Sequence, residues 1–138
     1  RQLWHTYLNY ARVLARTDEL DLAEEFCQKS KTILNDLGNK RGLAEARRVE
    51  GIIATMDSRW NQATRFFNES IELCEDAKDP YGKGETLREL ALMYFKHSDL
   101  GAARTILERA RDSFNEIGAN GDVSIINRKI SEIQQLKG

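Results

Sequence analysis

The sequence predicts an all-α chain made of three antiparallel helical hairpins and a closing C-terminal helix. The first observation is a gapless repeat, in which Ala23, Ala63 and Ala103 are separated by forty residues each. The second is composition, because one proline in a chain rich in Ala, Leu, Glu, Arg and Lys favours helix throughout. Each repeat also places apolar residues at intervals of three and four, which is the spacing of one helix face.

The repeated alanine lies in the longer helix of each unit. In the first unit the apolar stripe of this helix consists of Leu20, Ala23, Phe26, Cys27, Ser30, Leu34 and Leu37. Asp18, Ser58 and Ser98 share a place just before it, and we expect them to be N-caps. Gly38 and Gly118 follow its end, where a left-handed C-cap residue is expected.

A second helix precedes each of these long helices. Its close-contact position holds Ala11, Gly51 and Ala91, always twelve residues before the repeated alanine. Small residues at both positions allow two antiparallel helices to approach closely. We therefore predict no strand and seven helices, over residues 3–16, 19–37, 41–56, 59–77, 80–96, 99–117 and 122–136.

The pattern resembles the tetratricopeptide repeat. The third unit supplies Leu87, Leu90, Ala91, Tyr94, Ala103, Leu107 and Ala110 in the places of the repeat motif, and the second supplies Gly51, Ala63 and Phe67. The forty-residue length is similar to the lengthened repeats of kinesin light chains and of bacterial signalling and transcription-regulator proteins. The resemblance implies a right-handed α-solenoid.

This solenoid is expected to form a single domain over residues 1–138. Its repeats span about 3–40, 41–80 and 81–120, and a capping helix covers 122–136. Because the sequence begins with Arg1, we expect it to be a piece of a longer protein.

The second unit departs from the pattern, because Arg47 and Glu50 occupy places that hold Tyr or Leu in its neighbours. A dry interface around two unpaired charges would cost several kcal/mol. One alternative is an ion pair one turn apart. The other is a rotated helix that buries a different stripe, formed by Ala46, Val49, Ile53 and Met56.

Charge and motif content argue against catalysis and nucleic-acid binding. The net charge of −1 gives no field that would steer the chain onto nucleic acid or an anionic membrane. His5 and His97 have no partner at metal-ligand spacing, and Cys27 and Cys74 lie in apolar helix positions. We expect no enzymatic activity, no cofactor and no metal, and a cytoplasmic location.

What the resemblance implies about function is the binding of a partner polypeptide, or of another domain of the parent chain, in a concave groove. The first helix of each hairpin lines that groove in the family. The corresponding residues here are Leu8, Arg12, Arg48, Ile52, Met56, Arg88, Leu92, Phe95 and Arg128. The alternative is a regulatory domain that senses a peptide or small ligand in a bacterial signalling or transcription regulator. Exposed terminal repeats also allow a homo-oligomer.

Arg48, Arg88 and Arg128 recur at forty-residue spacing within this set. One interpretation is a column of guanidinium groups that holds a carboxylate or an acidic peptide. The other is that a glutamate on its own helix neutralises each arginine. The three glutamates at suitable spacing are Glu45, Glu85 and Glu132.

Overall fold

The computed structural model describes residues 2–137, which contain seven helices and no strand. The helices are α1 (Leu3–Arg16), α2 (Leu20–Leu37), α3 (Lys40–Met56), α4 (Trp60–Asp76), α5 (Pro80–Lys96), α6 (Leu100–Glu116) and α7 (Asn120–Lys137). Their bounds agree with the predicted ranges to within two residues. The all-α repeat fold is therefore confirmed. In the part of the chain so described, no helix is both long and apolar enough to cross a membrane.

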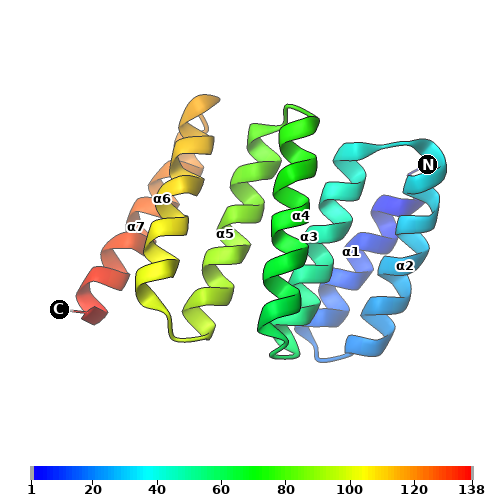
Figure 1. Cartoon of the computed structure of the whole chain (residues 1–138), viewed down its shortest axis with the longest axis horizontal. Coiled ribbons are helices and arrows are strands. Elements are labelled where there is room, and N and C mark those ends of the chain that lie inside the picture. Colours follow the sequence, from blue (N-terminus) through cyan, green and yellow to red (C-terminus); the bar gives the residue numbers. More distant parts are fainter. Residues whose placement is uncertain (1, 138) are drawn as a thin grey trace.

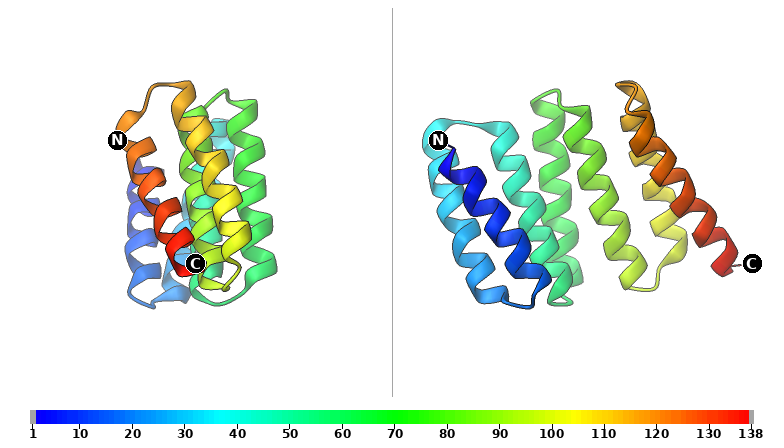
Figure 2. Two further views of the ribbon diagram at one scale, coloured as in Figure 1. Left: turned by 90° about the vertical axis from the view of Figure 1, so that its left-hand side faces the viewer. Right: turned by 180° about the vertical axis from the view of Figure 1, so that it is seen from behind.

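The helices form two layers, and the termini lie at opposite ends of the stack (Figures 1 and 2). The first helices of the hairpins and α7 make one layer, while α2, α4 and α6 make the other. Within the first layer α1 packs on α3 and α3 packs on α5. Helix α7 packs closely on α6, whereas its backbone lies farther from α5, so the layer opens between α5 and α7.

Left-handed residues interrupt the chain every twenty residues, once in each turn between helices. Gly38 and Gly118 have φ values of 63° and 67°, which confirms them as left-handed turn residues. The non-glycine members of the series are Asp18, Ser58, Lys78 and Ser98, with φ between 54° and 66°.

The prediction that Asp18, Ser58 and Ser98 are N-caps is therefore wrong. Each of them turns the chain, and the N-cap is the following residue. Among the caps of α2, α4 and α6, a side-chain bond is made only by Asp99, whose Oδ1 accepts from the Ala102 N–H at 3.1 Å. A short turn needs a left-handed residue more than it needs a capping side chain. Asp is among the residues enriched in that conformation, and Ser58 and Ser98 adopt it here as well.

Small residues mark the closest helix contacts. Ala23, Ala63 and Ala103 are fully buried, as is Ala11. Gly51 faces the ring of Phe67 so closely that an added Cβ would lie 2.5 Å from it. The predicted close-contact positions are therefore where the two helices of a hairpin meet.

In α3 both interpretations of Arg47 and Glu50 are partly right. Arg47 Nη1 lies 2.9 Å from Glu50 Oε1, and Glu50 also pairs with Lys31 of α2 at 3.0 Å. Three members of the alternative stripe, Ala46, Val49 and Ile53, are buried as well. The fourth, Met56, was expected to be buried but is 37% exposed. Helix α3 is enclosed on most sides because it packs on α1, α2, α4 and α5.

Both cysteines are buried and free, as their apolar positions predicted. The thiol of Cys27 donates to the Ala46 carbonyl at 3.5 Å. Burial, assisted by the charge of Glu50, raises the pKa of this thiol to about 12 from an ordinary value of 9.0.

This shift predicts a loss of stability at alkaline pH. Above pH 9 the unfolded chain releases the thiol proton while the native chain retains it. The contribution of the Cys27 thiol to the free energy of unfolding is therefore complete below pH 9. It is lost as pH rises toward 12, by roughly 1 kcal/mol per pH unit. The free energy of unfolding can be measured by urea for the wild type and for Cys27→Ala at pH 8 and pH 10.5. Between these pH values the wild type should lose more stability than the variant, which has no thiol at this position. A difference that does not change with pH would contradict the prediction.

Candidate partner-binding groove

The first helices present most of the predicted groove residues on one face, but three positions need correction. Leu8 is fully buried, so it belongs to the core and not to the groove. Arg48 is 8% exposed and lies mostly beneath the surface. Arg128 is exposed on α7, but it lines none of the hollows described below.

The arginines of this face pair with carboxylates on the next first helix. Arg12 Nη2 lies 3.0 Å from Glu45 Oε2, and Arg48 Nη1 lies 3.4 Å from Glu85 Oε1. Arg88 Nη1 continues the series to α7, at 3.6 Å from an oxygen of Asp122.

The expected pairs within one helix are therefore wrong for Arg48 and Arg88. The three observed pairs instead connect α1 to α3, α3 to α5, and α5 to α7. Neighbouring first helices lie side by side, so a carboxylate on the adjacent helix is within reach of a long arginine side chain. In α7 the position equivalent to Glu45 and Glu85 is held by Ile125, which has no charge. Arg88 therefore pairs with Asp122 instead.

Arg48 is held by a buried polar network as well as by Glu85. Its Nε donates to Thr86 Oγ1 at 3.0 Å, and the Thr86 hydroxyl lies 3.0 Å from Ser70 Oγ. Ser70 donates to the Ala44 carbonyl at 2.7 Å. The guanidinium of Arg48 is thus held directly by α5 and, through Thr86, is linked to α4, so it is poorly placed to meet a ligand.

A polar hollow of about 380 Å³ surrounds these ion pairs. Its lining contains four arginines and a histidine against three glutamates: His5, Arg12, Arg16, Glu45, Arg48, Glu85, Arg88 and Glu89. Because most of these cations already face a carboxylate, the hollow does not provide a free anion-binding site.

Beside the polar hollow lies an apolar surface that crosses from α3 to α7. Ile52, Met56 and Leu92 line a hollow of about 260 Å³ between α3 and α5. Leu92 also lines a second hollow of about 260 Å³, which is shared with Phe95 and lies between α5 and α7. The four apolar residues predicted for the groove on α3 and α5 therefore lie along one surface, and Leu92 connects its two halves.

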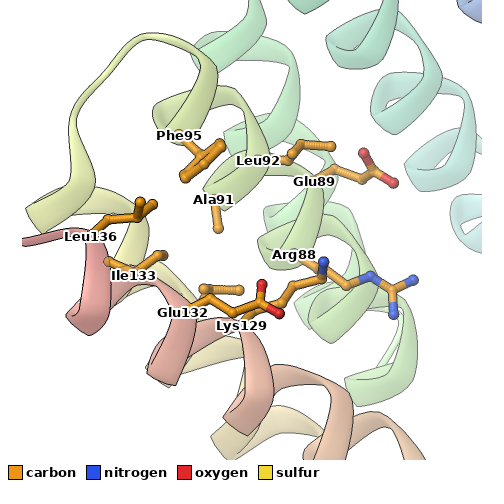
Figure 3. Close-up of a pocket in the computed structure, with 10 residues that line it drawn as sticks. Arg88, Glu89, Ala91, Leu92, Phe95, Lys129, Glu132, Ile133 and Leu136 are labelled. Atoms are coloured by element: carbon orange, nitrogen blue, oxygen red, sulfur yellow. The ribbon is translucent and has the colours of Figure 1, made fainter.

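The second hollow occupies the opening between α5 and α7. Figure 3 shows Ala91 and Phe95 of α5 across from Ile133 and Leu136 of α7. Leu107 of α6 completes the apolar lining. Charged groups stand at the rim in balanced number, and they are Arg88, Glu89, Lys129 and Glu132.

The apolar contribution of α7 was missed, because sequence reasoning assigned only Arg128 of this helix to the groove. Ile133 and Leu136 are three residues apart and therefore share a helix face. Ile133 is buried against the stack, whereas Leu136 is 64% exposed. The sequence signal that could have identified α7 as a wall of the groove is its apolar spacing of three and four, through Ile126, Ile130, Ile133 and Leu136.

Comparison with known proteins agrees with this architecture. A family model described as "Tetratricopeptide repeat" matches residues 4–76, which is more than half of the chain. A similar solved structure is that of BtubC (BKLC) from P. vanneervenii, with 15% sequence identity and a TM-score of 0.65. That alignment covers 98% of this chain and 64% of that chain, and at this identity it shows a shared fold. No curated protein sequence matches the chain.

Proposed function

Because the chain belongs to the tetratricopeptide repeat family, whose non-catalytic repeats mediate protein–protein interaction, we propose that it holds a segment of a partner polypeptide in the groove formed by α3, α5 and α7. The observation that carries the proposal is the apolar hollow between α5 and α7. Its exposed members, Leu92, Phe95 and Leu136, are 47%, 43% and 64% exposed.

Exposure of several large apolar side chains in one concave place supports binding. Single exposed apolar residues are normal on a protein surface, whereas a contiguous concave group marks an interaction site. Here three such residues surround a floor made by Ala91, Leu107 and Ile133, all of which are buried. A partner side chain that enters the hollow would remove apolar area from water on several sides.

The volume favours side chains of a polypeptide over a cofactor. Each apolar hollow measures about 260 Å³, below the roughly 300–1,000 Å³ of typical small-molecule sites. The two hollows share Leu92 and Glu89, so one ligand can occupy both. An amphipathic segment with two apolar residues on one face fits this arrangement.

The arginines that line the neighbouring polar hollow indicate that affinity comes from apolar contact. Arg12, Arg48 and Arg88 are each paired with a carboxylate of the chain. Binding should consequently change little with salt, because exposed charges act over only about 10 Å at 0.1 M ionic strength.

A peptide-display selection on the wild-type protein, followed by fluorescence anisotropy of the selected peptide, tests the proposal. We expect Leu92→Ser and Phe95→Ser each to weaken binding by about tenfold, which equals ~1.4 kcal/mol. The matched control is Ile117→Ser, because Ile117 is also 47% exposed but lies at the end of α6, outside the groove. Equal binding by all three variants, or selected peptides that bind Leu92→Ser as well as wild type, would contradict a site in this groove.

A further inference from the structure

The outward side of α1 is an exposed repeat-stacking surface, as the chain's own internal symmetry indicates. Positions that are forty residues apart occupy equivalent places in the stack. The places of Tyr10 and Val13 in α1 are held by Leu90 and Met93 in α5 and by Ile130 and Ile133 in α7. These four equivalents are at most 7% exposed, whereas Tyr10 and Val13 are 57% and 59% exposed.

In each later repeat this side is covered by the second helix of the preceding hairpin. Thr86 of α5 lies 3.0 Å from Ser70 of α4, and the Ala46 carbonyl of α3 accepts from Cys27 of α2. Asn127 of α7 accepts from Arg111 of α6 at 3.0 Å. The same interface therefore occurs three times within the chain.

The chemistry of the α1 surface matches that of α5. Thr6 holds the place of Thr86, and Leu3, Tyr10 and Val13 supply apolar groups along the same stripe. Leu3 is 52% exposed, and Thr6 is exposed as well. None of these four residues carries a charge, which is unusual for the solvent-facing side of a helix.

Helix α2 extends the surface with an aromatic group. The ring of Phe26 lies 5.7 Å from the rings of both Tyr7 and Tyr10. Lys29 Nζ is placed 5.4 Å from the centre of the Phe26 ring, so a cation borders the apolar stripe.

We propose that the outward side of α1 binds an amphipathic helix of another folded repeat unit, in the place that α4 takes on α5. The occupant should run antiparallel to α1, because consecutive helices of the stack alternate in direction (Figures 1 and 2). It should present a small or hydroxyl residue to Thr6, as Ser70 does to Thr86, and bulky apolar residues to Tyr10 and Val13. This surface lies on α1, and the groove proposed above lies between α3, α5 and α7.

A second copy of this chain fits the surface less well. Its opposite end is closed by α7, whose outward residues include the exposed Ser131 and Gln135. A head-to-tail contact between two copies would press the apolar stripe of α1 onto these polar side chains of α7. The polar side chains would lose their water without gaining a hydrogen bond, which is unfavourable. The chemistry therefore favours a heterologous apolar helix.

The probe is a labelled synthetic peptide with the sequence of residues 60–76, the helix that covers the equivalent side of α5. Cys74 in the peptide is replaced by serine to prevent disulfide formation. Anisotropy titrations of the 138-residue protein should show saturable binding at peptide concentrations below about 1 mM, and a scrambled peptide should not bind. Val13→Asp should weaken binding by at least about tenfold, because a carboxylate in an apolar interface must lose its water.

Leu92→Ser separates this proposal from the groove, because it should leave peptide binding unchanged. Loss of binding in Leu92→Ser with none in Val13→Asp would place the peptide in the groove and overturn the α1 surface. Absence of binding by wild type would overturn it too. Light scattering over a range of concentrations tests whether a second copy of the chain binds the α1 surface. If the wild type forms a dimer and Val13→Asp is a monomer, the surface binds a second copy and the proposal is overturned.

Discussion

Gly51→Ala is expected to destabilise the protein although alanine is the better helix former. The added Cβ would lie 2.5 Å from the ring of Phe67, and a buried ring in a packed core has little freedom to move. Overpacking of this kind costs about 1–3 kcal/mol, whereas the gain in helix propensity is at most ~1 kcal/mol. Urea unfolding followed by circular dichroism should show a net loss of stability.

The third hairpin supplies the compensating change. It has Ala91 and Leu107 at the places of Gly51 and Phe67, so a larger residue on one helix accompanies a smaller one on the other. Gly51→Ala combined with Phe67→Leu should consequently be more stable than the sum of the two single changes predicts, by ~1 kcal/mol or more.

Gln62→Leu serves as the control for this double-mutant cycle, because Gln62 is exposed on the same helix as Phe67. It should show no coupling to Gly51→Ala. Strictly additive effects of Gly51→Ala and Phe67→Leu would mean that the two residues are not in close contact.

Much of the fold could be predicted because the repeat supplies the same information three times. Ala23, Ala63 and Ala103 identify one helix interface independently of one another, and all three are fully buried. The turns were located correctly, but their chemistry was assigned wrongly at Asp18, Ser58 and Ser98. An Asp or Ser before a helix is compatible with both an N-cap and a left-handed turn residue, and the length of the turn decides between them.

The groove was predicted less completely, because its properties depend on contacts between repeats. Periodicity within one helix places Arg48 near Glu45, yet Arg48 pairs with Glu85 on the neighbouring helix. The hollow at Phe95 depends on how far α7 lies from α5, which no local pattern describes. Leu8 was misplaced for a related reason, since the rotation of α1 about its axis is set by packing.

The second large effect is expected at Thr86, which holds the guanidinium of Arg48. Thr86→Val preserves the shape of the side chain but removes the oxygen that accepts from Arg48 Nε. A buried donor left without a partner costs about 1–3 kcal/mol, so urea unfolding should show a clear loss of stability. The same network explains why Ser70 is fully buried without being unsatisfied, since it donates to the Ala44 carbonyl.

Arg48→Met shows whether that cost comes from the guanidinium. With no donor to satisfy, Thr86→Val should be nearly neutral in the Arg48→Met background, and replacing a buried charge by an apolar side chain is often tolerated. An equal cost of Thr86→Val in both backgrounds would mean that Arg48 does not depend on Thr86. The guanidinium would then be free to turn toward the groove, and an acidic ligand would become the better expectation for this face of the protein.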